Sequence, residues 1–160
     1  MELLDVVDAE DRVIGTAPKP EIYRQLLPHR IVHVLIFNQK GEMALQLRSK
    51  NLSFCPHHWS TAVGGHVQSG ESYEQAAQRE YQEELNQQSV LHLFSKDLYQ
   101  LPQRPPKFVV TFKTIYDGPF SPNPQEVEKV AFFSLPHLKS MIQQGEKFHP
   151  ELLFLLEKYF

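Results

Sequence analysis

The stretch GHVQSGESYEQAAQREYQEELN occupies residues 65–86 and carries the strongest structural signal in the chain. Ser72 followed by Gln75 fits a capping box, so we expect a helix to begin near Ser72, with Ser69 as an alternative cap one turn earlier. Four side chains at successive steps of four residues predict a buried face of this helix: Tyr73, Ala77, Tyr81 and Leu85.

A second row on the same helix is acidic. Glu80, Glu83 and Glu84 share one side of the last turns, where negative charge opposes the helix dipole and each like-charged pair costs about 0.2–0.5 kcal/mol. Arg79 can pair with Glu83, but one cation does not neutralise three anions. The ordinary explanation is a solvated acidic face. The alternative is a bound cation, and clustered carboxylates suit Mg²⁺ or Mn²⁺, which are used most often where phosphate groups supply further ligands.

Length and composition predict one soluble domain, residues 1–160, with 41% hydrophobic residues. A net charge of −3 gives no general basic field, so we expect a small-molecule partner and no nucleic-acid polymer. Cys55 is the only cysteine, which favours a reducing compartment such as the cytoplasm. Apolar runs such as residues 31–37 are far shorter than the roughly 18–20 residues of a membrane span, and the acidic start does not resemble a secretory signal. We therefore expect no membrane association.

Turn residues and apolar runs divide the chain into strands and helices. Strands are expected at residues 2–7 and 12–16 as a hairpin, at 31–37 and 43–48 as a second hairpin, and at 59–63, 90–94, 108–116 and 127–133. Further helices are expected at residues 20–27, after Ser134 and from Pro150. The last helix is expected to turn four side chains toward the core: Leu152, Leu153, Leu156 and Tyr159.

The spacing around the acidic row resembles the signature of the Nudix hydrolases, GX5EX7REUXEEXGU, in which U is a bulky aliphatic residue. Six fixed positions match: Gly65, Glu71, Arg79, Glu80, Glu83 and Glu84. The departures are Tyr81 for the first aliphatic residue, Asn86 for the second glycine and Gln87 for the last aliphatic residue. After glycine, asparagine best tolerates the left-handed conformation expected at the helix end. Gln87 has no such explanation.

The resemblance extends over nearly the whole chain. The segments LPHRIVHVLIFNQKGEMALQLRSK, HHWSTAVGGHV and PQEVEKVAFFSLPHL are similar to a subgroup close to isopentenyl diphosphate isomerase. The resemblance implies an α/β fold, an α/β/α sandwich around a mixed β-sheet, with the motif forming a loop, a helix and a loop. It also implies attack of water on a diphosphate linked to another group, as in nucleoside diphosphate derivatives, assisted by Mg²⁺ or Mn²⁺. The acidic row supports this chemistry, because grouped carboxylates can hold a metal and one glutamate can activate water.

The resemblance also assigns roles to the residues of the motif. Glu83 and Glu84 are the principal metal ligands, and Glu80 is a further ligand or the general base. The Gly65 carbonyl is another candidate ligand. Arg79 orients the glutamates by ion pairing, and Glu71 holds the loop.

Four residues outside these positions are weaker candidates, each with an ordinary alternative. His66 directly follows Gly65, but His66 and His29 are equally typical of hydrogen-bonded structural histidines. Glu126 lies where some family members place another carboxylate near the metals, although its segment is equally typical of a solvated loop. Arg48 is a candidate phosphate contact or an exposed hairpin end.

Two other functions remain open beside hydrolysis. The isomerase uses a cysteine just before the Gly-His of its loop, and the matching residue here is Gly64, which argues against isomerisation. Cys55 lies nine residues earlier and is expected to be a small buried hydrophobe. A nucleotide-sensing module would be expected to lack a glutamate of the motif, and all are present.

No pattern in the sequence identifies the substrate. We expect the loops at residues 103–107 and 121–125 to recognise it. Nucleoside diphosphate sugars, dinucleotides, nucleoside triphosphates and isoprenoid diphosphates all remain open. The amino-terminal hairpin is a candidate surface for a homodimer.

Overall fold

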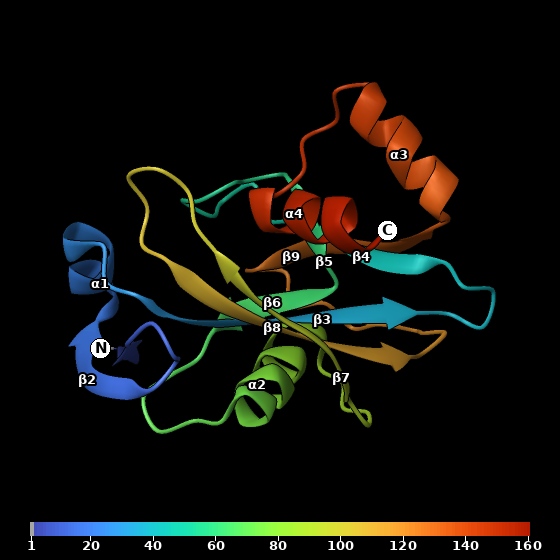
Figure 1. Ribbon diagram of the computed structural model, residues 1–160. Helices are drawn as coiled ribbons and strands as arrows, with labels where there is room; N and C mark the ends of the chain where they lie inside the picture. The colour runs from blue at the N-terminus through green and yellow to red at the C-terminus, as the bar shows by residue number, and fades with distance from the viewer. Residues whose placement is uncertain (1) are drawn as a thin grey trace.

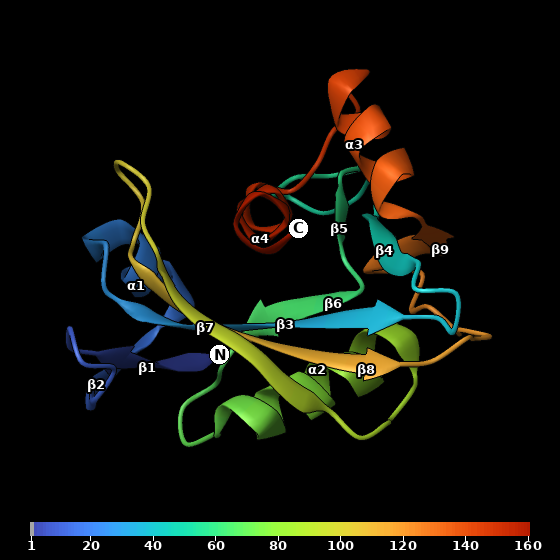
Figure 2. The ribbon, with the colours of Figure 1, turned by 45° about the vertical axis from the view of Figure 1, so that its right-hand side comes forward.

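The alternating side chains of one central strand, β3 (His29–Phe37), define the two layers that enclose the sheet. In the computed structural model, which describes residues 2–160, Val32, Val34 and Ile36 pack toward helix α2 (Tyr73–Leu85). Leu35 belongs to the apolar cluster on the opposite face, with residues of α3 (Leu135–Gln143) and α4 (Pro150–Tyr159). This period-two alternation places helices on both faces, as Figures 1 and 2 show, and confirms the predicted α/β/α sandwich.

The sheet is mixed and divides into two arms. In the first arm, β3 runs parallel to β8 (Lys107–Ile115), which pairs antiparallel with β7 (His92–Tyr99). The second arm is built on β4 (Met43–Arg48), which pairs with β9 (Val127–Phe133) and β5 (Trp59–Thr61). The predicted hairpin between β3 and β4 is present at its turn, but the two strands pair only at Phe37 and Met43. They diverge because β4 takes its partners from the second arm.

The segment that joins the two arms corrects one prediction. A single strand was expected at residues 59–63, running into the glycine pair Gly64 and Gly65. The chain instead forms β5, breaks at Ala62, and continues as β6 (Val63–His66), which pairs with β3. Gly64 and Gly65 therefore lie inside a strand, opposite His33 and Val32. A single residue, Ala62, thus connects the two arms of the sheet at this point.

The chain ends mostly follow the prediction. The amino-terminal hairpin forms from β1 (Leu3–Val7) and β2 (Val13–Pro18), and α1 (Lys19–Gln25) follows it. In α4, however, Leu152 and Leu155 are the buried residues, whereas Leu153 and Tyr159 are each 36% exposed. The expected inward positions of Leu153 and Tyr159 were therefore wrong. None of the helices formed by residues 2–160 is long and apolar enough to cross a membrane.

Helix α2 begins and ends as its sequence predicts. Ser72 is the N-cap, and the reciprocal bonds of the capping box with Gln75 are both present. Asn86 ends the helix in the left-handed region, with φ 52° and ψ 43°. Gln87, which the sequence left unexplained, donates its side-chain N–H to the Tyr116 hydroxyl at 2.5 Å. A polar residue at this position therefore ties the helix exit to the end of β8.

The left-handed conformation of Asn86 predicts a difference between two variants. Both Asn86→Gly and Asn86→Ala lose the bond from the Asn86 side chain to the Ser121 carbonyl. Only alanine has a Cβ atom, which is crowded by the backbone in the left-handed conformation. We expect the alanine variant to be less stable than the glycine variant by about 1 kcal/mol, measured by urea unfolding. Equal stabilities would show that the left-handed conformation of residue 86 does not disfavour alanine relative to glycine.

Candidate active site

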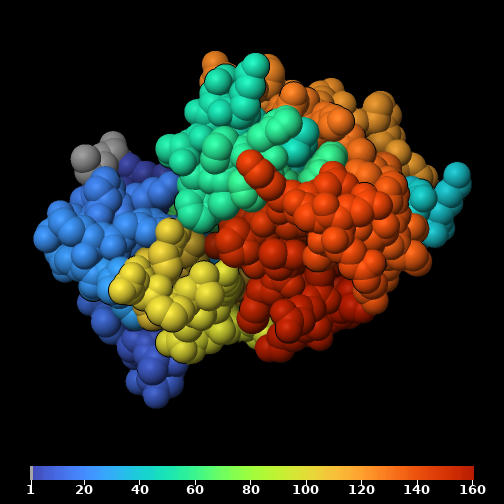
Figure 3. Space-filling view, turned by 90° about the horizontal axis from the view of Figure 1, so that it is seen from above, coloured from blue at the N-terminus to red at the C-terminus, as the bar shows by residue number. Residues whose placement is uncertain are grey.

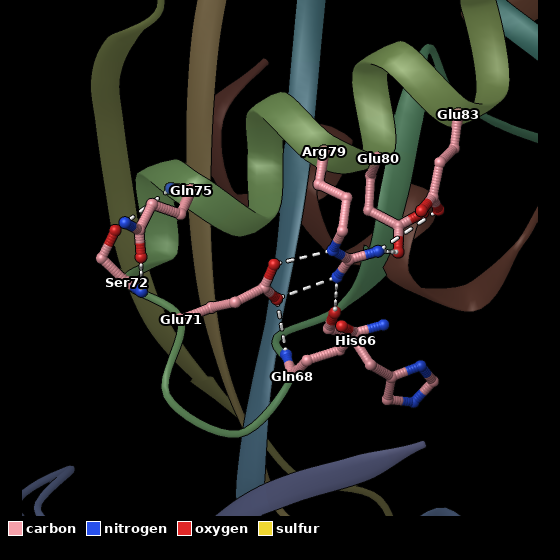
Figure 4. Close-up of polar contacts among 8 residues, drawn as sticks. All are labelled: His66, Gln68, Glu71, Ser72, Gln75, Arg79, Glu80 and Glu83. Carbon is pink, nitrogen blue, oxygen red and sulfur yellow. Dashed lines mark hydrogen bonds and ion pairs between the residues drawn. The ribbon is translucent and has the colours of Figure 1, made fainter. Parts of the chain in front are cut away.

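Arg79 connects the loop before α2 with the acidic row on the helix. Its guanidinium donates to both carboxylate oxygens of Glu71, at 2.7 and 2.9 Å, and to the His66 carbonyl at 2.9 Å. It also contacts Glu80 at 2.8 Å and Glu83 at 3.3 Å, as Figure 4 shows. Hydrogen bonding to Glu71 raises the pKa of Arg79, so its charge is fixed. Arg79 thus orients three carboxylates at once.

Glu71 contacts both the backbone of the loop before α2 and the Arg79 guanidinium. One of its oxygens accepts the backbone N–H of Gln68 at 2.7 Å while the pair with Arg79 is kept. The loop between β6 and α2 is therefore closed by a charged contact at its base. This contact fixes the direction in which α2 leaves the strand.

Gly65 allows the carboxyl group of Glu80 to lie directly against β6. A Cβ atom at this position would lie 2.3 Å from the Glu80 carboxyl carbon and 2.5 Å from one of its oxygens. Any other residue would displace Glu80 or the strand. The glycine of the motif is thus required by the close approach of a glutamate to the backbone.

Glu84 is the most deeply buried carboxyl group of the acidic row. It is 6% exposed and accepts a hydrogen bond of 2.6 Å from the Gln46 side chain, whose second N–H is donated to the Ala62 carbonyl. Burial, and then the adjacent carboxyl group of Glu80, raise the pKa of Glu84 well above its usual value. Burial also raises the pKa of Glu80. Without a bound cation, the site therefore holds negative charge at a cost in folding free energy.

Glu126 brings a fourth carboxylate to the site from the residue before β9. Its Oε2 atom is buried and has no hydrogen-bond partner among residues 2–160. Its pKa is raised by burial, and then by the charges of Glu80 and Glu83. A buried acceptor without a donor beside other carboxylates is consistent with a site that takes a cation.

A cavity of about 540 Å³ brings most of the predicted site residues together. This volume lies within the usual range for small-ligand pockets. Eight of the candidates line it: Arg48, Gly65, His66, Arg79, Glu80, Glu83, Glu84 and Glu126. Glu71 and His29 do not line it. Of the two predicted recognition loops, residues 103–107 contribute Arg104 and Lys107, whereas residues 121–125 contribute none. The 121–125 loop lies at the end of α2, where Asn123 donates its N–H to the Glu84 carbonyl, and its role in recognition stays a prediction.

The two candidate histidines stack on one another, with His66 at the cavity wall and His29 behind it. The rings of His29 and His66 stack at 5.5 Å, and the Tyr23 hydroxyl lies 2.7 Å from Nε2 of His66. Burial lowers the pKa of His29 to about 4 and also lowers that of His66, so both rings are neutral near pH 7. His29 is fully buried and bonded to the Leu27 carbonyl. His66 reaches the cavity, and His29 supports it from behind.

Arg48, the last residue of β4, contacts the loop that contains Cys55 at the rim of the cavity. Arg48 donates to the carbonyls of Phe54 and Cys55, so it holds this loop while lining the cavity. Cys55 is half-buried and has a φ of 47°, so the expectation of a buried apolar cysteine was wrong. The strained turn around Cys55 places the neighbouring Phe54 on the rim of the cavity.

Sequence reasoning missed several polar residues on the cavity wall. His33 lies in the apolar run of β3, where its Nε2 is 2.8 Å from Glu151 and its Nδ1 is 2.6 Å from the Thr61 hydroxyl. Lys107 donates to the other oxygen of Glu151 at 2.9 Å. One signal was available, because a histidine inside a buried strand needs polar partners. The identity of those partners depends on tertiary structure.

The residues present fit a hard divalent cation by their chemistry. Glu80, Glu83, Glu84 and Glu126 supply only carboxylate oxygens, the ligands that Mg²⁺ and Mn²⁺ prefer. In the described part of the chain, no three His, Cys, Asp or Glu side chains already converge on one point as a finished ion cage. Glu83, half of whose side chain is exposed, is paired with Arg79 and lines the cavity.

Comparison with known proteins agrees with this geometry. A model of the NUDIX domain matches residues 27–156. The chain belongs to the Nudix family. An uncharacterised Nudix hydrolase of Pseudomonas aeruginosa is 30% identical to this Nudix protein over 159 residues, which are 99% of this chain and 93% of that protein. The predicted family is therefore confirmed, and membership indicates a hydrolase acting in general on nucleoside diphosphate-linked compounds.

Two further relatives relate to the fold and to the predicted subgroup. A crystal structure of a protein from Deinococcus radiodurans superposes with a TM-score of 0.83 at 26% identity, covering 99% of both chains. An isopentenyl-diphosphate Delta-isomerase of Serratia proteamaculans is 35% identical over 124 residues, which are 78% of this chain and 69% of the isomerase. The likeness to the isomerase subgroup is thus confirmed at the level of sequence.

The raised pKa of Glu84 predicts a pH-dependent difference in stability. A carboxyl group whose pKa is raised on folding destabilises the folded protein when it ionises, so stability falls as pH rises above the ordinary value of 4.5. In a chelator, we expect Glu84→Gln to become progressively more stable than the wild type above that pH. The gain should be about 1.4 kcal/mol for each unit by which the pKa is raised.

Unfolding by urea at a series of pH values measures this difference. The buried histidines affect both proteins alike, so their contribution cancels in the comparison. A difference that stays constant or shrinks with rising pH would contradict the assignment of Glu84 as a buried, strained carboxylate.

Proposed function

We propose that this Nudix protein is a Mg²⁺- or Mn²⁺-dependent pyrophosphohydrolase that cleaves a diphosphate linkage by attack of water. The proposed substrate is a nucleoside diphosphate derivative or a related small molecule. The observation that carries the proposal is the set of four carboxylates on one cavity wall, with Glu84 buried and Glu126 holding an acceptor without a donor. A site built only to be stable would pair or exclude these charges.

Each carboxylate has a role in this proposal that its surroundings support. Glu83 and Glu84 would hold the metal, and the Gly65 carbonyl and Glu126 are further candidate ligands. A divalent metal at this position supplies charge neutralisation for the diphosphate and a lower pKa for water. Glu80 is a further ligand or the general base, because burial raises its pKa toward the range in which a carboxylate accepts a proton efficiently. Arg79 would act by positioning Glu80 and Glu83.

The rest of the cavity suits a phosphorylated ligand. Arg104 lines it and forms no ion pair within residues 2–160, while Lys107 lies beside the carboxylate of Glu151. These cations lie outside the acidic row and would contact phosphate oxygens distant from the metal. We also propose that the whole chain acts as one Nudix domain. With a single cysteine it would work in the cytoplasm, and the amino-terminal hairpin is its candidate dimer surface.

The proposal predicts the behaviour of two variants in a screen of diphosphate compounds. Glu83→Gln and Glu84→Gln keep the side-chain shape but remove a charge. We expect each to lower hydrolysis of the best substrate by at least about 100-fold, because an interaction worth several kcal/mol in the transition state is lost. Calorimetric titration with Mn²⁺ should show weaker metal binding in both. Glu146→Gln, at an exposed position outside the cavity, is the matched control.

Two results would count against this function. Near-wild-type hydrolysis by both variants would show that the acidic row is structural. Tight binding of a nucleotide, with no release of phosphate or pyrophosphate from any compound, would instead favour a sensor.

Isomerisation of isopentenyl diphosphate is the second candidate, because an isomerase is among the relatives. Gly64 stands where that enzyme has its cysteine. A Cβ atom at Gly64 would lie 2.9 Å from Nδ1 of His33. The His33 ring cannot move aside cheaply, because Glu151 and Thr61 hold both of its nitrogens. The space for a thiol is therefore filled.

We expect neither the wild type nor Gly64→Cys to convert isopentenyl diphosphate to dimethylallyl diphosphate. The product is measured by chromatography after incubation with Mg²⁺ or Mn²⁺. Formation of dimethylallyl diphosphate by the wild type at an enzymatic rate would overturn the preference for hydrolysis. Its formation only by Gly64→Cys would show that His33 yields to the new side chain.

A further inference from the structure

A second, smaller cavity of about 270 Å³ adjoins the one that holds the carboxylates. The two share five lining residues: Phe54, Arg104, Lys107, His149 and Glu151. The remaining lining of the smaller cavity is aromatic, aliphatic or proline: Tyr99, Leu101, Pro105 and Pro150. It is formed where the rim loop of Phe54, the turn between β7 and β8, and the start of α4 meet, on the face shown in Figure 3. The site thus extends from an acidic end to an apolar end.

Arg104 gives the region between the two ends a net positive charge, because Lys107 is paired with Glu151. Burial alone would raise the pKa of Glu151, but hydrogen bonding from His33 and the charge of Lys107 hold it well below its usual value. Its ionised carboxylate is paired with Lys107, so the two charges balance. The guanidinium of Arg104 lies 4.9 Å from the centre of the Phe54 ring and has no carboxylate partner within residues 2–160. Arg104 therefore suits a phosphate lying between the carboxylates and the apolar end.

His149 places one unpaired donor at the junction of the two cavities. It caps α4, and its Nδ1 accepts the backbone N–H of Glu151 at 3.1 Å, so the proton of the neutral ring is on Nε2. Burial lowers its pKa to about 4, which keeps the ring neutral. The residue is 7% exposed, and Nε2 has no acceptor within residues 2–160. Its own backbone N–H is bonded to the Trp59 carbonyl at 2.7 Å, so the donor is held in place.

We propose that the smaller cavity binds a planar heteroaromatic ring of the substrate, such as a nucleobase, with His149 donating from Nε2 to an acceptor on the ring. Phe54, whose ring lies 5.4 Å from that of His149, would cover one face of the bound ring. This inference rests on the proposed function and names the group that lies beyond the diphosphate. An aliphatic prenyl chain fits less well, because it offers no acceptor and would leave a buried N–H without a partner.

Binding of monophosphates in a chelator tests the subsite without requiring hydrolysis. The probes are AMP, GMP, CMP, UMP and dimethylallyl monophosphate, titrated by calorimetry. We expect at least one nucleotide to bind at least about 10-fold more tightly than the prenyl compound. His149→Asn keeps an oxygen that can cap α4 but removes the Nε2 donor, and should weaken that nucleotide by about 5- to 10-fold. Phe54→Ala should weaken it by at least about 5-fold.

The matched control is His92→Asn, the same substitution at an exposed residue of β7, which should leave nucleotide binding unchanged. Thermal unfolding of both asparagine variants checks that α4 remains folded. Equal or tighter binding of the prenyl compound, no nucleotide binding, or wild-type nucleotide affinity in both His149→Asn and Phe54→Ala would each overturn the inference. Nucleotide binding that depends on His149 and Phe54, with no hydrolysis of any diphosphate, would support the subsite and contradict the proposed hydrolase function.

Discussion

The contacts of Arg79 are the constraint on which the rest of the site depends. One guanidinium is bonded to the loop through Glu71, to the strand β6 through the His66 carbonyl, and to the acidic row through Glu80 and Glu83. Its planar fork can serve all of these acceptors at once, which a lysine cannot do. The position of α2 relative to β6, and with it the approach of Glu80 to Gly65, follows from this arrangement. The carboxylates are therefore positioned before any ligand arrives.

The acidic end of the site was largely predictable from the sequence because its residues are close together in the chain. The cap at Ser72, the left-handed residue Asn86 and the pairing of Arg79 with Glu83 all depend on spacings within one helix. Local geometry fixes such contacts whatever the rest of the fold does. The same holds for the strands of the amino-terminal hairpin, which a short polar turn connects.

The opposite wall of the site was not predictable, because its residues are far apart in the chain. His33 and Glu151 are separated by 118 residues, and Lys107 comes from a third element. No spacing in the sequence connects them, and their pairing exists only once β3, β8 and α4 are packed together. The break at Ala62 escaped prediction for a similar reason, because the residues of a strand do not reveal which arm of the sheet each half will join. Leu153 was also misplaced, because it directly follows the buried Leu152 and the rotation of one residue along the helix turns its side chain out of the core.

The two ends of the site are built by different segments of the chain, which has a consequence for how such a site can change. Glu80, Glu83 and Glu84, which would carry out the chemistry, are supported by β6 and α2, whereas the apolar end is formed by the rim loop, the turn before β8 and the first turn of α4. Substitutions in the second group leave the bonds of Arg79 untouched. Related proteins with this fold can therefore differ in ligand preference through substitutions in these segments while the contacts that position the carboxylates stay the same.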